Sequence, residues 1–206
     1  MKTPLHYQLS EYDCGPTSLL NAISFLFERE EIPPDVLRNI MLYSLDCYSP
    51  EGAPGKHGTS RTAMMFLAHW LNGFGQAGQL DIACSYLRVD DVYLGTNSRL
   101  SDALRQNGAA VVRLFYEVDH YVLLTGLEND SVLMFDPYYQ TESFQETDIE
   151  LINDHPFSFN RRVPLKYLNQ KAQALYSLGP IEDREAILLF NSRTKLTPEA
   201  TIEYFI

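Results

Sequence analysis

A cysteine stands near the start of the chain, where a helix is expected to begin. Asp13 suits the N-cap and Pro16 suits the first turn. After Cys14, apolar residues recur at helical spacing: Leu19, Leu20, Ile23, Leu26 and Phe27. A thiol at a helix N-terminus lies at the positive end of the macrodipole, which favours its thiolate form. Because the thiolate is the nucleophilic form, we expect Cys14 to be able to attack a carbonyl carbon.

A base and an orienting carboxylate occur together further along the chain. Residues 119–127 and 131–138 are rich in Val, Leu, Tyr and Phe, which predicts two strands of a hairpin that carry His120 and Asp136. With a three-residue loop at 128–130, residue 122 pairs with 136. His120 and Asp136 then share one face of the sheet, with Cβ atoms on the order of 7 Å apart. A two-residue loop would place them on opposite faces, because a slip of one residue inverts the strand. The sequence is compatible with both loops.

In the first of these registers, Asp136 can hold one nitrogen of the His120 ring while the other nitrogen faces Cys14. Asp119 is the rival carboxylate, but neighbours in a strand point to opposite faces. An acyl-transfer site also needs hydrogen-bond donors for the developing oxyanion, and the Cys14 N–H supplies only one. Gln8, six residues before Cys14, is the nearest upstream candidate for the second donor.

Four short motifs in the first 140 residues carry a resemblance to a known family: Gln8, Asp13-Cys14-Gly15-Pro16-Thr17, His120-Tyr-Val-Leu and Phe135-Asp136-Pro137-Tyr138. Their order and spacing resemble the bacteriocin-processing cysteine peptidases, which remove double-glycine leaders, and more broadly the papain-like cysteine hydrolases. The resemblance implies Cys14 as nucleophile, His120 as base, Asp136 as orienter and Gln8 as oxyanion-hole donor, with no cofactor. It also implies a papain-like α+β fold, in which the cysteine helix packs on an antiparallel sheet that carries the histidine and the aspartate.

The shared motifs do not predict that this chain cleaves the same substrate as the family. Family members that process leaders are usually the N-terminal part of a membrane exporter, whereas no apolar run here approaches the ~20 residues that a membrane span needs. We therefore expect a peptide or small amide substrate and a bacterial source, without a defined cleavage site. An amine in place of water as acyl acceptor would make the protein an acyltransferase or peptide ligase. A non-catalytic peptide-binding module is the alternative from another class, although its degenerate relatives typically lack the cysteine.

Composition narrows the class of protein. The 206 residues suit one domain, residues 1–206, and the net charge of −11 disfavours a nucleic-acid partner. Cys14, Cys47 and Cys84 include no close pair, so we expect neither a disulfide nor a zinc site, and Cys47 and Cys84 are expected to be structural. The first six residues lack the apolar stretch of a signal peptide. We therefore expect a cytoplasmic location, because the cysteines form no close pair and the start lacks a signal-peptide pattern.

Helical periodicity and turn signals predict an α+β order of elements. Helices are expected over residues 14–30, 35–45 (with Asp35 as cap), 59 or 60 to 72, 97–106 (with Asn97 or Ser98 as cap) and 164–172. Strands are expected over residues 81–89, 109–116 and 185–190, in addition to the hairpin. The Gly- and Pro-rich stretch 49–60, which contains His57, is predicted to be a functional loop, and with the segment after Tyr139 it is expected to set specificity. Residues 198–206 fit either a helical turn or an extended segment.

Overall fold

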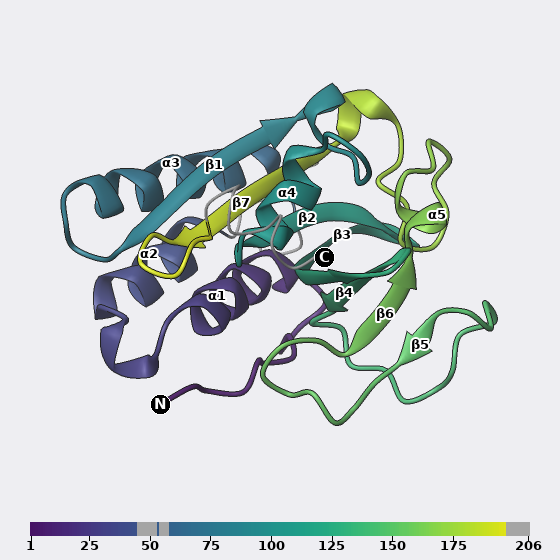
Figure 1. The fold of residues 1–206 in the computed structure, drawn as a ribbon, viewed down its shortest axis with the longest axis horizontal. Coiled ribbons are helices and arrows are strands. Elements are labelled where there is room, and N and C mark those ends of the chain that lie inside the picture. Colours follow the sequence, from purple (N-terminus) through teal and green to yellow (C-terminus); the bar gives the residue numbers. More distant parts are fainter. Residues whose placement is uncertain (45–52, 54–57, 197–206) are drawn as a thin grey trace.

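The computed structural model describes residues 1–44, 53 and 58–196. These residues form a mixed α+β structure around a seven-stranded antiparallel sheet with strand order β1-β7-β2-β3-β4-β6-β5 (Figure 1). The strands are β1 (Ile82–Arg88), β2 (Ala109–Tyr116), β3 (Val118–Glu128), β4 (Ser131–Phe135), β5 (Glu150–Leu151), β6 (Arg161–Pro164) and β7 (Glu185–Asn191). The helices are α1 (Cys14–Leu26), α2 (Pro34–Ser44), α3 (Arg61–Gln76), α4 (Arg99–Arg105) and α5 (Leu165–Leu168), with 3₁₀ turns at Arg29–Glu31, Val89–Asp91 and Ile181–Asp183.

Apolar residues cover both faces of the central strands. On one face, residues such as Leu19 of α1 and Leu67 of α3 pack in a single cluster with Leu123 of β3. On the other face, Leu100 of α4 belongs to a cluster with Val122 of β3. Successive residues of a strand point to opposite faces, so a strand that is buried on both faces needs the unbroken apolar run seen after His120. None of the helices in the described ranges has the length and apolarity to cross a membrane.

The β3–β4 hairpin has the register that places His120 and Asp136 on the same face, but its turn and its bulge differ from what the sequence indicated. Its turn has two residues, not three, because Glu128 pairs with Ser131. A bulge at Thr125 then adds one residue to β3, so that beyond it Leu123 pairs with Phe135. Continuing this register pairs residue 122 with residue 136, as a three-residue loop would have done. The bulge therefore returns His120 and Asp136 to the same face.

Several predicted helices end elsewhere. The first begins at Cys14 as predicted but ends at Leu26, not at residue 30, because buried Phe27 adopts an extended conformation and a capping box starts the next turn. The second begins at Pro34, so the prediction of Asp35 as its cap was wrong and Asp35 lies in the first turn. Its predicted last residue, 45, lies outside the described residues.

Two further helices also differ in extent from the prediction. The helix predicted over residues 164–172 is a single turn, α5, since the Leu168 carbonyl accepts a 2.7 Å hydrogen bond from the Leu178 N–H. The helix predicted over residues 60–72 continues to Gln76 as α3. The other predicted elements, β1, α4, β2 and β7, are confirmed with small changes at their ends, and of the two possible caps of α4 the structure has Ser98. The short strand β6 and the two-residue edge strand β5 were not predicted.

Two glycines near the end of α3 are expected to respond in opposite ways to alanine. A Cβ at Gly75 would lie 1.9 Å from the carbonyl oxygen of Ile82, whereas a Cβ at Gly73 would meet nothing within 4 Å. Gly75→Ala should lower the free energy of unfolding by about 1–3 kcal/mol, because it forces α3 away from β1. Gly73→Ala should raise it by about 0.5–1 kcal/mol through the helix propensity of alanine. Denaturant unfolding of both variants checks this pair, and equal effects would contradict the close approach of α3 to β1.

Candidate active site

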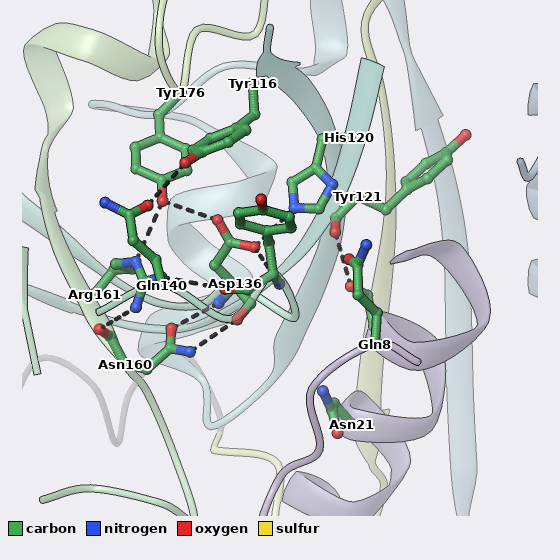
Figure 2. Close-up of polar contacts among 12 residues, drawn as sticks. Gln8, Asn21, Tyr116, His120, Tyr121, Asp136, Gln140, Asn160, Arg161 and Tyr176 are labelled. Atoms are coloured by element: carbon green, nitrogen blue, oxygen red, sulfur yellow. Dashed lines mark hydrogen bonds and ion pairs between the residues drawn. The ribbon is translucent and has the colours of Figure 1, made fainter. Parts of the chain in front are cut away.

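His120 and Asp136 form a buried pair at one end of the sheet. His120 is 6% exposed and Asp136 is fully buried. His120 Nε2 lies 2.7 Å from Asp136 Oδ1 (Figure 2). The predicted contact between these two residues is thus present, and it leaves Nδ1 as the ring nitrogen available to another group. The rival carboxylate, Asp119, is exposed and pairs instead with Arg113 at 2.8 Å.

The charges around His120 favour its protonated form. Burial lowers the pKa of His120, but the negative charge and hydrogen bond of Asp136 raise it, and so do a hydrogen bond to Cys14 and the charge of Cys14. The net effect raises the pKa of His120 from 6.5 to about 10. Burial raises the pKa of Asp136. The charge and hydrogen bond of His120, the charge of Arg161 and the Tyr138 N–H lower it by more, so the net effect is a pKa below the ordinary value. The site therefore holds an imidazolium against a carboxylate at neutral pH.

Cys14 is brought to this pair by the helix that it begins. The Ser18 hydroxyl, one turn after Cys14, donates a 2.9 Å hydrogen bond to the carbonyl oxygen of Tyr121, the neighbour of His120 in β3. Residues four apart lie on the same face of a helix, so this bond turns the Cys14 side of α1 toward the histidine strand. Cys14 itself is 8% exposed. Its influence on the pKa of His120 agrees with this placement.

Asp13 precedes the helix but does not cap it through its side chain. Its carboxylate accepts hydrogen bonds from the backbone N–H groups of Leu9 (2.9 Å) and Ser10 (2.7 Å) and from the Ser10 hydroxyl. Asp13 is thus the N-cap residue as predicted, but its side chain makes no capping hydrogen bond: the carboxylate closes the loop that joins Gln8 to Cys14. As a result, the first N–H groups of α1 are not occupied by the Asp13 side chain.

Gln8 is held from two sides. Asn21 of α1, fully buried, exchanges two 2.8 Å hydrogen bonds with the backbone of His6. The Gln8 N–H donates a 2.9 Å hydrogen bond to the carbonyl oxygen of Pro137, next to Asp136. The Gln8 side chain points toward β3 (Figure 2). One hydrogen of its amide group goes to the Ser10 carbonyl at 2.8 Å, which leaves the second free to donate.

Two buried oxygen atoms in this region have no hydrogen-bond partner among the described residues: Gln8 Oε1 and Thr59 Oγ1. Thr59 packs over the start of α1, since a Cβ at Gly15 would lie 2.2 Å from its hydroxyl oxygen. Gly15 is thus required by the close approach of the segment that ends the predicted 49–60 loop. Buried polar atoms are normally paired, so each of these two oxygens could accept a hydrogen bond from a ligand.

The surroundings of Asp136 include residues that the sequence did not reveal. Asn160 fixes its backbone: Oδ1 accepts from the Asp136 N–H and Nδ2 donates to the Asp136 carbonyl, both at 2.8 Å. The Tyr138 N–H donates to Oδ1 and the Tyr176 hydroxyl donates to Oδ2, each at 2.8 Å. Buried Arg161 lies next to the Tyr176 hydroxyl, on the side away from His120 (Figure 2). No motif marks Tyr176, Asn160 or Arg161, because they come from the poorly predicted region after Tyr139.

The remaining predicted residues lie apart from this cluster. Cys84 is buried and free, and burial raises its thiol pKa far above the ordinary value, as expected for a structural cysteine. Cys47 and His57 lie outside the described residues, as does most of the 49–60 loop. Tyr139 is exposed and packs edge-on against Tyr7. Within the described ranges, no group of three His, Cys, Asp or Glu side chains could hold a metal ion.

Comparisons of the chain with protein-family models and with curated proteins gave no match.

The protonation of His120 can be tested directly. We expect its ring to stay protonated at pH 8 and to lose the proton near pH 10, as monitored by ¹⁵N chemical shifts of the imidazole. Because this pKa is raised above 6.5, the His120 proton contributes stability that is fully present below pH 6.5, as long as Asp136 stays ionised, and that is lost as the pH rises through about 10.

Asp136→Asn is the matched variant. It removes the negative charge while keeping the shape, so the His120 ring should titrate at lower pH than in the parent protein. Titration of the parent ring near pH 6.5, or at the same pH in both proteins, would contradict the buried pair.

Proposed function

We propose that this protein is a cysteine hydrolase that cleaves a peptide or amide bond through a thioester intermediate. The observation that carries the proposal is the arrangement of a helix-start cysteine against a buried histidine whose other ring nitrogen is held by a carboxylate at 2.7 Å. A nucleophile, a base and an orienting group in this order are the parts of a covalent acyl-transfer site. The motifs and the packing of α1 on an antiparallel sheet support a papain-like enzyme similar to the bacteriocin-processing peptidases.

In this mechanism, Cys14 and His120 react as a thiolate and an imidazolium. The sulfur attacks the carbonyl carbon of the substrate, and the second free hydrogen of the Gln8 amide and the Cys14 N–H stabilise the oxyanion. His120 then gives its proton to the leaving amine, and the C–N bond breaks as the thioester forms. A water molecule, deprotonated by the now neutral His120, attacks the thioester, which releases the acid and restores the thiolate and the imidazolium.

Asp136 has a separate role, which is to keep the imidazole ring in place. Its hydrogen bond fixes the ring with Nδ1 free to exchange a proton with sulfur. The fully buried carboxylate also stabilises the imidazolium, which must persist until the leaving amine takes the proton.

The environment of the site favours a substrate with amide N–H groups. Gln8 Oε1 and Thr59 Oγ1 are buried acceptors without partners, and both belong to segments that adjoin the start of α1. A peptide backbone bound there would supply the missing donors. The unpaired cysteines Cys14 and Cys84 fit work in a reducing compartment such as the cytoplasm.

Selective alkylation tests the nucleophile. At pH 6.5, iodoacetamide should modify Cys14 at least about tenfold faster than Cys84, because Cys14 begins a helix beside the base His120 whereas burial holds Cys84 as a thiol. Cys14→Ala should abolish hydrolysis of peptide substrates, and Cys84→Ala should retain it. Mass spectrometry of peptides from the labelled protein gives the two rates. Equal rates, or turnover by the Cys14→Ala variant, would remove Cys14 from the mechanism.

A further inference from the structure

Tyr176 occupies the side of Asp136 that His120 leaves open. Its side chain is fully buried, and its hydroxyl donates a 2.8 Å hydrogen bond to Asp136 Oδ2. His120 uses the other oxygen, Oδ1. The Tyr138 N–H also donates to Oδ1, whereas Tyr176 is the side-chain donor to Oδ2 among the described residues, so that loss of the Tyr176 hydroxyl would leave a buried charged oxygen without that partner.

The backbone places Tyr176 at a conformational cost. Its φ of 56° lies in the left-handed region, which bulky residues rarely adopt. Hydrogen bonds of 2.8 Å from the Tyr176 N–H to the Phe115 carbonyl, and from the Phe115 N–H to the Ser177 carbonyl, lock this conformation onto β2. Its ring also packs against Tyr116, with ring centroids 5.6 Å apart. Strained conformations that are fixed in this way are concentrated at functional sites.

Arg161 places a buried positive charge next to the Tyr176 hydroxyl. Its guanidinium is buried, and its Nε donates to the Tyr176 hydroxyl at 3.3 Å. Its other nitrogens donate to the carbonyl oxygens of Asn160 (3.0 Å) and Tyr138 (3.3 Å). The Tyr176 hydroxyl therefore accepts from a cation and donates to an anion, which strengthens both hydrogen bonds in a site that water does not reach.

We propose that Tyr176 is a positioning residue of the active site, whose hydroxyl keeps Asp136 ionised and turned toward His120. The hydrogen-bonded series then runs from Arg161 through Tyr176 and Asp136 to His120. This inference rests on the proposed function, because it assigns Tyr176 a role in maintaining the reactive form of Cys14.

The test is the pH dependence of Cys14 alkylation by iodoacetamide in the Tyr176→Phe variant. Without the hydroxyl, the ionised form of Asp136 is less stabilised, so Asp136 takes up a proton at higher pH. Protonated Asp136 no longer stabilises the His120 imidazolium, and the reactive form of Cys14 is lost with it. The acid limb of the rate profile should move upward by about one pH unit, the shift that corresponds to one hydrogen bond to a charged group. Circular dichroism confirms that the variant is folded.

Tyr86→Phe is the matched control. Tyr86 also donates its hydroxyl proton to a buried carboxylate, that of Glu185, which hydrogen-bonds Tyr121 and is not a partner of Asp136 or His120 in the described contacts. Its acid limb should coincide with that of the parent protein. An unshifted limb in Tyr176→Phe, or an equal shift in both variants, would overturn the positioning role.

A second substitution does not depend on how well the phenylalanine variant folds. Placing 3-fluorotyrosine at position 176 keeps the ring and makes the hydroxyl a stronger donor, so the acid limb should move to lower pH. An unchanged or raised limb would overturn the inference. Failure of the proposed function gives a different result: in the parent protein itself, Cys14 would react no faster than Cys84 at any pH.

Discussion

A hydrogen bond of 2.7 Å joins His120 to Asp136 in a part of the protein where both side chains are buried. Burying two ionised groups costs more free energy than their attraction returns unless their remaining hydrogen-bonding positions are filled. Here the Tyr138 N–H and the Tyr176 hydroxyl donate hydrogen bonds to the Asp136 carboxylate, and the Asn160 side chain hydrogen-bonds the backbone N–H and carbonyl of Asp136. The sheet, the segment after β4 and the start of α1 all serve to satisfy this pair.

The same constraint explains how distant segments meet. Polar contacts that bind α1 to the rest of the site recur along one side of the helix, at Cys14, Ser18 and Asn21. Ser18 fixes α1 to the histidine strand, and Asn21 fixes the segment that carries Gln8. Because these contacts are buried and directional, a shift of α1 would break several of them at once. The reactive cysteine is thus positioned by hydrogen bonds, while the apolar cluster between α1, α3 and the sheet supplies most of the driving force.

Local signals in the sequence predicted the parts of the site that depend on short stretches of chain. The helix start at Cys14, the β2 strand and the hairpin strands follow from capping residues and apolar patterns. The register of His120 and Asp136 could not be fixed, because it depends on a bulge at Thr125 that offsets a two-residue turn. Tyr176, Asn160 and Arg161 were missed because they act through tertiary contacts, and a single turn of helix with short strands leaves little periodicity to recognise.

The central claim is that Cys14, His120, Asp136 and Gln8 form one acyl-transfer site. A crystal structure of the protein after reaction with a peptide aldehyde tests it most directly. The account predicts a covalent bond from Cys14 Sγ to the aldehyde carbon, with the new oxygen within hydrogen-bonding distance of the Cys14 N–H and Gln8 Nε2, and with His120 still bound to Asp136. An aldehyde bound elsewhere, or an adduct whose oxygen points away from Gln8, would contradict it.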